Sequence, residues 1–310
     1  MDRDGSIVVR EFGKLREDGV APEDTIVDLG SITKMVTAVA ILKLVEQDKL
    51  RLNETLESVW PDVPEDKEDI TVHELLTHTS GLTNEVGHDT ERVSRETFVD
   101  RVFETEYDED DAGKYKYSNA GYGLLAAIIE RRSGKSFDAF LQEDLLKPAG
   151  LDPIGYELAY SDDRSLQTAR AWRTSFQRQS IQGASWGGGA PGWNLIGNGG
   201  LVATPVSFLR FWSAVRQGRV ISQPLLDKAL TPHVDGRGDE KSFYGYGLMM
   251  QDAPPHGRIY WHDGENDHFS SEWRELGASG LIAFTAGRDK DAFEAMRIIL
   301  SELSERAVGS

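Results

Sequence analysis

Apolar residues fill one stretch of the chain so fully that it predicts a helix buried on nearly every side. The stretch runs from Ile32 to Val45, and polar residues such as Thr37 and Lys43 are few within it. A helix with this composition passes through a protein core instead of lying along its surface. We therefore predict a central helix over residues 31–47.

Two polar side chains at the start of this helix lie on one face. Ser31 and Lys34 are three residues apart, which places them one turn from each other. Serine is a poor nucleophile until a neighbouring base takes its proton, and a lysine whose pKa is lowered by burial can be that base. Alone, the Ser-x-x-Lys pattern more often marks a capping serine followed by a surface lysine, so other parts of the chain must decide.

The remaining periodicities predict strands towards both ends of the chain and helices between them. Asp4-Gly5 resembles a hairpin turn, and Asn119 is a plausible N-cap. We predict strands over 6–13, 258–261, 268–273 and 281–284, and helices starting at Val72 and covering 122–132, 137–147, 204–218 and 291–305.

This order predicts an α+β fold in which helices interrupt a sheet. The sheet region comprises 1–30 plus 236–310, and the mainly helical region comprises 31–235. We expect the two regions to form one compact catalytic unit with the site between them. A glycine-rich stretch, 186–200, is expected to line the cleft, and the acidic run 108–111 is expected to be a solvated loop.

Composition narrows the possible partners. The formal charge of −18 argues against binding nucleic acid or anionic lipid, and fits either adaptation to high salt or an ordinary acidic enzyme. No apolar run reaches the length of a membrane span, and no signal peptide is visible. The sequence as written therefore predicts a soluble cytoplasmic protein, or an extracytoplasmic one if its N-terminus is truncated.

Metal and cofactor chemistry is not expected. The chain has no cysteine, which excludes thiolate sites and cysteine nucleophiles. His73 and His78 are five residues apart, so on a helix they would point about 140° away from each other instead of towards one metal. The glycine-rich stretch lacks the Gly-Lys-Ser/Thr ending of a phosphate loop.

Three short motifs in order make the chain resemble the serine β-lactamase and penicillin-binding-protein superfamily, including class C β-lactamases, D-alanyl-D-alanine carboxypeptidases, D-aminopeptidases and β-lactamase-like carboxylesterases. They are Ser31-Ile32-Thr33-Lys34, Tyr117-Ser118-Asn119 and His262-Asp263-Gly264. The resemblance spans nearly the whole chain. It implies a β-lactamase/transpeptidase-like fold, an antiparallel sheet flanked by helices with a large helical insertion.

The resemblance also implies roles for the motif residues. Ser31 would attack a carbonyl carbon, while Lys34 and Tyr117 would share the proton transfers, the Tyr117 pKa being lowered by the neighbouring ammonium. Asn119 would hydrogen-bond Lys34 and the substrate amide. The backbone N–H groups of Ser31 and Glu265 would form the oxyanion hole.

Two departures from the family pattern affect the expected substrate. β-Lactamases usually carry Lys-Thr-Gly where this chain has His262-Asp263-Gly264, and a negative Asp263 would repel the carboxylate of a β-lactam. Family members usually have a helix and a strand before the turn at Asp4-Gly5, and that strand normally lies inside the sheet.

We therefore expect a serine hydrolase that acts through an acyl-enzyme on a carboxylic ester or small amide, without cofactor. The alternatives are a D,D-carboxypeptidase, a D-aminopeptidase or a class C-like β-lactamase. An alternative of another class is a non-catalytic binding protein that keeps the fold. The sequence leaves the oligomeric state open.

Overall fold

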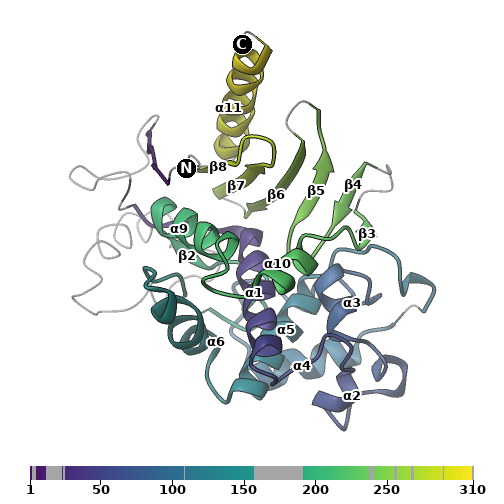
Figure 1. The fold of residues 1–310 in the computed structure, drawn as a ribbon. Helices are drawn as coiled ribbons and strands as arrows, with labels where there is room; N and C mark the ends of the chain where they lie inside the picture. Colours follow the sequence, from purple (N-terminus) through teal and green to yellow (C-terminus); the bar gives the residue numbers. More distant parts are fainter. Residues whose placement is uncertain are drawn as a thin grey trace.

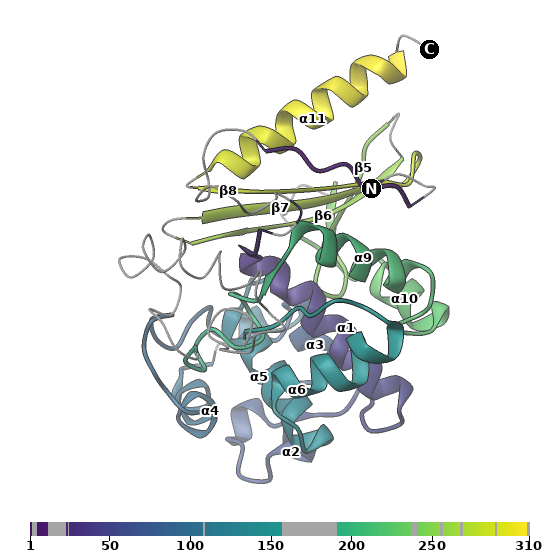
Figure 2. The same ribbon diagram turned by 90° about the vertical axis from the view of Figure 1, so that its left-hand side faces the viewer.

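The computed structural model places a sheet between one long helix and a body of shorter helices (Figures 1 and 2). It describes residues 1, 5–11, 23, 25–107, 109–156, 191–236, 241–254, 257–266, 269–288 and 290–308. The helices are α1 (Thr33–Glu46), α2 (Leu56–Val59), α3 (Val72–Thr77), α4 (Arg95–Glu104), α5 (Asn119–Ser133), α6 (Phe137–Phe140), α9 (Pro205–Arg216), α10 (Gln223–Ala229) and α11 (Asp291–Val308).

Within the described residues, six strands form one antiparallel sheet in the order β3-β4-β5-β6-β7-β8. Neighbours in sequence are neighbours in the sheet, so short turns connect them. The strands are β3 (Val234–Asp235), β4 (Ser242–Tyr244), β5 (Met249–Asp252), β6 (Arg258–Glu265), β7 (Phe269–Leu276) and β8 (Leu281–Arg288). A separate two-stranded pair joins β1 (Val27–Asp28) to β2 (Val202–Ala203).

Figure 2 shows α11 covering one face of the sheet, while α1, α9 and α10 lie on the other side. Together with the antiparallel strands, this layering confirms the predicted α+β fold. The division into a sheet region and a mainly helical region that form one compact catalytic unit stays a prediction.

Helix α1 confirms the predicted central helix. Residues Gly30–Ile32 form a 3₁₀ turn, and α1 then runs to Glu46 with nearly all of its side chains buried. It packs against α5, which is itself buried over most of its length. Gly123 of α5 lets another helix approach, because a Cβ there would lie 2.3 Å from the Phe98 ring of α4. The start of α1 is therefore held rigidly in the core.

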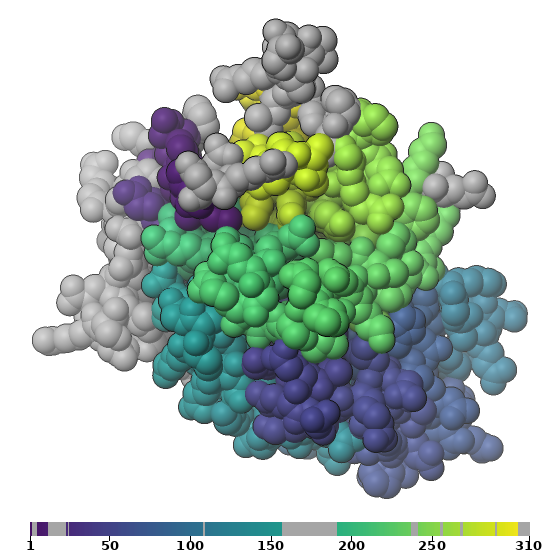
Figure 3. Space-filling model, viewed as in Figure 1, coloured from purple at the N-terminus to yellow at the C-terminus, as the bar shows by residue number. Residues whose placement is uncertain are grey.

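The predicted strand over 6–13 is wrong for its described part, since residues 5–11 belong to neither sheet. A strand needs a ladder partner, and residues 5–11 pair with no strand, whereas Met1 lies at the edge of β8. Met1 exchanges two backbone hydrogen bonds with Ile282 of β8. Figure 3 shows these first residues, in purple, lying against the yellow C-terminal part. Val8 is 67% exposed, whereas Ile7 is half-buried and packs against the core.

Two further differences concern helices. Ser118, not Asn119, caps α5, and its hydroxyl accepts a hydrogen bond from the Gly121 N–H. Helix α4 was also not predicted; its buried residues are Phe98, Val99 and Val102. Parts of several predictions, namely Asp4, 12–13, 108, 186–190 and His268, lie outside the described residues.

The described helices include none that is both long and apolar enough to cross a membrane.

Candidate active site

Ser31 lies where the first turn before α1 meets strand β6. Two glycines permit the close approach: a Cβ on Gly30 would lie 2.8 Å from the Gly264 Cα, and a Cβ on Gly264 would lie 2.6 Å from the Ser31 backbone nitrogen. Gly30 also has a φ of +50°, which L side chains rarely adopt. These glycines set Ser31 directly against the third motif.

Lys34 lies one turn into α1 and is fully buried. Its ammonium nitrogen is 3.1 Å from Ser31 Oγ and donates to the Asn198 carbonyl oxygen at 2.6 Å. Burial lowers the pKa of Lys34 from 10.5 to about 7, and the nearby carboxylate of Asp89 raises it only in part. Asn198 belongs to the described end of the glycine-rich stretch, which therefore does reach this site.

Tyr117 brings the second motif to the same point. Its hydroxyl interacts with the Ser31 side chain, and its ring centroid lies 4.7 Å from Lys34 Nζ. Burial raises the pKa of Tyr117, and the negative charges of Asp263 and Glu85 add to that effect. The prediction that a neighbouring ammonium lowers this pKa is therefore wrong. The loss of hydration raises the pKa of Tyr117, and burial also lowers the pKa of Lys34, so that the neighbouring amine carries less positive charge.

His78 positions this tyrosine, although sequence reasoning considered it only as a metal ligand. It caps α3 in the left-handed conformation, with φ of 58°, and its ring lies 4.4 Å from the Tyr117 ring. The Ser118 N–H donates to Nδ1, so the ring proton is on Nε2, 3.1 Å from the Tyr244 hydroxyl. Burial keeps the pKa of His78 well below its ordinary value, and the ring is neutral.

His262 is also neutral. Its Nδ1 donates to the Asp263 carbonyl oxygen at 2.6 Å, which leaves Nε2 to accept from the Tyr244 hydroxyl at 3.4 Å. Burial lowers the pKa of His262 to about 4, against the opposing effect of the Asp263 charge. The third motif therefore lacks the cation that a lysine would supply there.

The register of β6 decides where its last backbone groups point. Asn266 donates to Phe269 across the β6–β7 hairpin, so Asp263 and Glu265 have their N–H and C=O groups on the side away from β7. Strand β5 pairs with β6 only as far as Trp261. Beyond that point the open side is filled by the turn that carries Ser31.

Asn119 lies beside the site but not as expected. Its Nδ2 donates to Glu85 Oε1 at 3.2 Å, whereas the Lys34 hydrogen bonds go to Ser31 and Asn198. Its Oδ1 atom is buried and accepts no hydrogen bond from any residue that the structure describes. The predicted bond between Asn119 and Lys34 is thus not formed.

Carboxylates that the sequence analysis did not single out surround this constellation. Asp28 is buried and accepts from the Gly30 N–H at 2.7 Å, which holds the turn before Ser31. Glu85 and Asp89 follow α3, and both act on the charge of Lys34. Burial, with the neighbouring charge of Glu85, raises the pKa of Asp89 to about 6. Acidic residues in a loop give no signal in the sequence that they converge on a serine.

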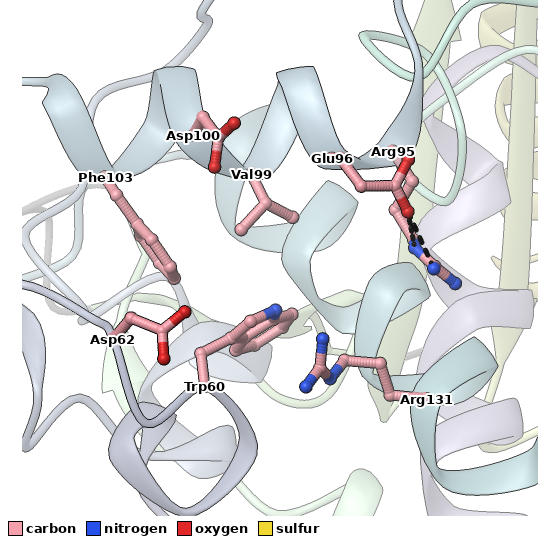
Figure 4. Close-up of a pocket in the computed structure, with 8 residues that line it drawn as sticks. All are labelled: Trp60, Asp62, Arg95, Glu96, Val99, Asp100, Phe103 and Arg131. Atoms are coloured by element: carbon pink, nitrogen blue, oxygen red, sulfur yellow. Dashed lines mark hydrogen bonds and ion pairs between the residues drawn. The ribbon is translucent and has the colours of Figure 1, made fainter.

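A separate pocket of about 260 Å³ lies between α2, α4 and α5, and Figure 4 shows the Trp60 ring and the Asp100 carboxylate in its wall. None of its lining residues belongs to the three motifs. Among the described residues there is no cluster of three or more His, Cys, Asp or Glu side chains suited to a metal ion.

Comparisons with known proteins agree with this arrangement. The chain is 27% identical over 269 residues to a penicillin-binding protein of Bacillus subtilis, covering 82% of this chain and 58% of that protein. It is 28% identical over 221 residues to the D-alanyl-D-alanine-carboxypeptidase/endopeptidase AmpH of Escherichia coli, covering 66% of this chain and 53% of that protein. The chain thus spans about half the length of the curated relatives it matches.

The fold also matches solved structures. The D-amino acid amidase of Ochrobactrum anthropi superposes with a TM-score of 0.71 at 20% identity, covering 94% of this chain and 90% of that one. A family model described as Beta-lactamase matches residues 3–298. On this match, which extends over nearly the whole sequence, the chain belongs to the beta-lactamase family.

Proposed function

We propose that this protein is a serine hydrolase that works through an acyl-enzyme, with Ser31 as nucleophile and Lys34 as its base. The observation that carries this proposal is the fully buried Lys34 amine 3.1 Å from Ser31 Oγ. Within the described residues it forms no ion pair with a carboxylate, and its pKa of about 7 leaves much of it uncharged at neutral pH. An uncharged amine can accept the serine proton.

In the first step the Ser31 proton passes to Lys34 Nζ while Oγ bonds to the carbonyl carbon of the substrate. The carbonyl π electrons move onto its oxygen, and the N–H groups of Ser31 and Glu265 stabilise that charge. As the tetrahedral intermediate collapses, Tyr117, whose raised pKa keeps it protonated, gives its proton to the leaving group and takes the proton held by Lys34, so that both residues return to their starting states. Water then attacks the carbonyl carbon of the acyl-enzyme and gives a proton to Lys34, and the bond to Ser31 Oγ breaks as Oγ takes that proton back, which releases the acid.

The charges of the third motif favour substrates that bring no carboxylate to it. His262 is neutral and Asp263 is negative, so a β-lactam or a peptide ending in a free carboxylate meets repulsion instead of a cation. Two unit charges about 4 Å apart interact by roughly 4 kcal/mol at an effective dielectric near 20, and solvent exposure reduces this. We therefore place a neutral ester or small amide first. D,D-carboxypeptidase or β-lactamase activity, suggested by the names of relatives, comes second.

A fluorophosphonate probe tests the nucleophile. We expect it to label the wild type at Ser31 and to leave Ser31→Ala unlabelled, while the exposed Ser58→Ala serves as a matched control. Labelling that persists in Ser31→Ala would contradict the assignment. A folded wild type that is neither labelled nor active on nitrophenyl esters would instead support a non-catalytic binding protein.

The substitution Asp263→Thr tests whether the charge of Asp263 affects the choice of substrate. This substitution should improve hydrolysis of a chromogenic cephalosporin more than hydrolysis of a short-chain nitrophenyl ester, by about tenfold in the ratio of their kcat/KM values. Equal changes in both substrates would show that Asp263 does not face the bound substrate.

A further inference from the structure

The second and third motifs belong to different parts of the molecule, and Tyr244 lies between them. The second motif runs into α5, whereas the third lies on β6 of the sheet. Tyr244 belongs to β4 and is fully buried. Its ring centroid lies 4.7 Å from that of His78, at the end of α3, and 6.3 Å from that of His262. Tyr244 is therefore placed to connect the two motifs.

A continuous series of hydrogen bonds runs through this tyrosine. The Ser118 N–H donates to His78 Nδ1 at 3.1 Å, and His78 Nε2 lies 3.1 Å from the Tyr244 hydroxyl. The same hydroxyl lies 3.4 Å from His262 Nε2, and His262 Nδ1 lies 2.6 Å from the Asp263 carbonyl oxygen. These residues are here called the bridge, which begins in the second motif and ends in the third.

The two ends of the bridge fix the direction of each hydrogen bond in it. A backbone N–H can only donate and a backbone carbonyl can only accept, so His78 Nδ1 carries no proton and His262 Nδ1 carries one. The neutral His78 then donates from Nε2 to the Tyr244 oxygen, and the Tyr244 hydroxyl gives its proton to Nε2 of the neutral His262. The two histidines have opposite tautomers, and the hydroxyl joins them because it both accepts and donates.

Each end of the bridge lies beside a group of the proposed reaction. The His78 ring packs against the ring of Tyr117, with 4.4 Å between their centroids. At the other end, Asp263 lies in the part of β6 that meets the turn of Ser31, two residues before the proposed oxyanion donor Glu265. A misplacement of about 1 Å between reacting groups can reduce a rate by about 100-fold. The length of the bridge therefore affects a spacing on which the reaction depends.

We propose that Tyr244 and His78 are positioning residues, which hold Tyr117 and the end of β6 at the separation that acyl transfer needs. This inference rests on the proposed acyl-transfer function and adds to it two residues that act through others. Because the bridge arranges groups that stabilise the transition state, its loss should lower kcat more than it changes KM.

A second tyrosine of the same segment provides a matched control. The Tyr246 hydroxyl also bonds a histidine of α3, His73, at 2.8 Å, and the Tyr246 ring stacks on that of His233. In the described parts of the chain these contacts reach none of the three motifs. Tyr244→Phe should lower kcat on a nitrophenyl ester by about tenfold or more with KM within about twofold, whereas Tyr246→Phe should leave both within about twofold.

His78→Asn interrupts the bridge at a second point and serves if Tyr244→Phe does not fold. Asparagine tolerates the left-handed conformation of this position, where φ is 58°, and its side-chain oxygen can still accept from the Ser118 N–H. Its shorter side chain does not extend to the Tyr244 hydroxyl. We expect the same selective loss of kcat as in Tyr244→Phe.

Nuclear magnetic resonance of isotope-labelled histidine rings tests the bridge itself, without reference to activity. The wild type should show the proton on Nε2 of His78 and on Nδ1 of His262, assigned by comparison with His78→Asn and His262→Gln. A hydrogen bond donated to Nε2 favours the neutral ring, so the pKa of His262 should rise in Tyr244→Phe from its wild-type value of about 4. It should stay unchanged in Tyr246→Phe, which leaves the nearby charges of Asp263 and Lys34 equally in place.

Two kinds of failure are distinguishable. An active wild type, labelled at Ser31, in which Tyr244→Phe loses no more kcat than Tyr246→Phe would overturn the positioning role and leave the hydrolase intact. The same tautomer on both rings would also overturn it. So would an unchanged pKa of His262 in Tyr244→Phe, because the Tyr244 proton would then go to the neighbouring Tyr122 hydroxyl instead. A wild type with neither labelling nor turnover would overturn the acyl-transfer function itself.

Discussion

Two buried lysines, Lys34 and Lys67, differ in the groups that their side-chain nitrogens contact. Lys67 is 2% exposed, and its ammonium pairs with the Asp66 carboxylate at 2.8 Å. Lys34 is 0% exposed, but its nitrogen contacts a serine hydroxyl and a backbone carbonyl instead of a carboxylate. Both side chains pass close to a tyrosine ring. The difference lies in the partner that each nitrogen meets.

An ion pair offsets part of the cost of burying an ammonium, whereas contact with neutral acceptors offsets less of it. The Lys67 side chain is thus held inside the fold by a carboxylate partner. Burial of Lys34 favours loss of its proton, and the Ser31 hydroxyl lies within hydrogen-bond distance of the Lys34 nitrogen. A buried lysine is a candidate base when, like Lys34, it has no carboxylate partner.

The largest expected effect separates the two lysines by activity. Lys34→Met should reduce kcat/KM on a nitrophenyl ester by roughly 10²–10⁴-fold, the usual contribution of a general base. Lys67→Met, assayed below its own melting temperature, should stay within a few fold of the wild type, because Lys67 contacts no residue of the three motifs. Similar losses in both variants would mean that Lys34 also has only a structural role.

The next effect concerns the coupling of Lys34 to Tyr117. Each contacts Ser31, so removing either one interrupts the same proton transfer. The double variant of Tyr117→Phe and Lys34→Met should then lose little more activity than the worse single variant, as residues acting as a unit do. Losses that multiply in full would show two independent roles and would contradict the shared mechanism.

The sequence predicted this constellation only in part, and the reasons are physical. The spacing of Ser31 and Lys34 placed both side chains on one face of a helix, but the two later motifs were needed to predict that the pair belongs to an active site. The direction of the Tyr117 pKa shift could not be predicted, because it depends on burial and on carboxylates that are remote in sequence, such as Asp263. Asn119 was assigned a partner by analogy, whereas Glu85, one helix away, takes its amide.

The fold, like the site, could be predicted from the sequence only in part. Long periodic segments such as α1 and α11 were predicted, whereas α4, with few apolar residues and much charge, was missed. The strand expected over 6–13 failed because alternation says nothing about whether a neighbouring strand offers a free edge. Local patterns specify elements, but tertiary contacts decide which of them form.

A pH profile sharpens the comparison further. Because burial lowers the pKa of Lys34 to about 7, kcat/KM on a neutral ester should rise with pH and level off about one unit above that value. A neutral substrate is needed, so that its own ionisation does not contribute. In Lys67→Met the same inflection should persist. A profile flat from pH 6 to 8 would show that Lys34 does not titrate in this range and is not the base.

The smallest expected effect is on stability, and it has opposite signs for the two lysines. Lys67→Met leaves Asp66 without its partner and should lower the free energy of unfolding by about 1 kcal/mol, a modest loss because Asp66 is 44% exposed. Lys34→Met replaces an unpaired buried amine by an apolar side chain of similar length and should leave stability unchanged or raise it by roughly 1–3 kcal/mol at pH 7.

The pH dependence of stability identifies the cause of the gain in Lys34→Met. The folded state holds Lys34 with a pKa of about 7 against 10.5 for the free side chain, so between these values the unfolded state binds more protons. Wild-type stability should therefore increase from pH 7 towards pH 10 relative to Lys34→Met, and the advantage of the variant should shrink. An advantage that is independent of pH, measured by urea unfolding at pH 7 and 9, would assign the gain to packing and not to the proton that Lys34 sheds.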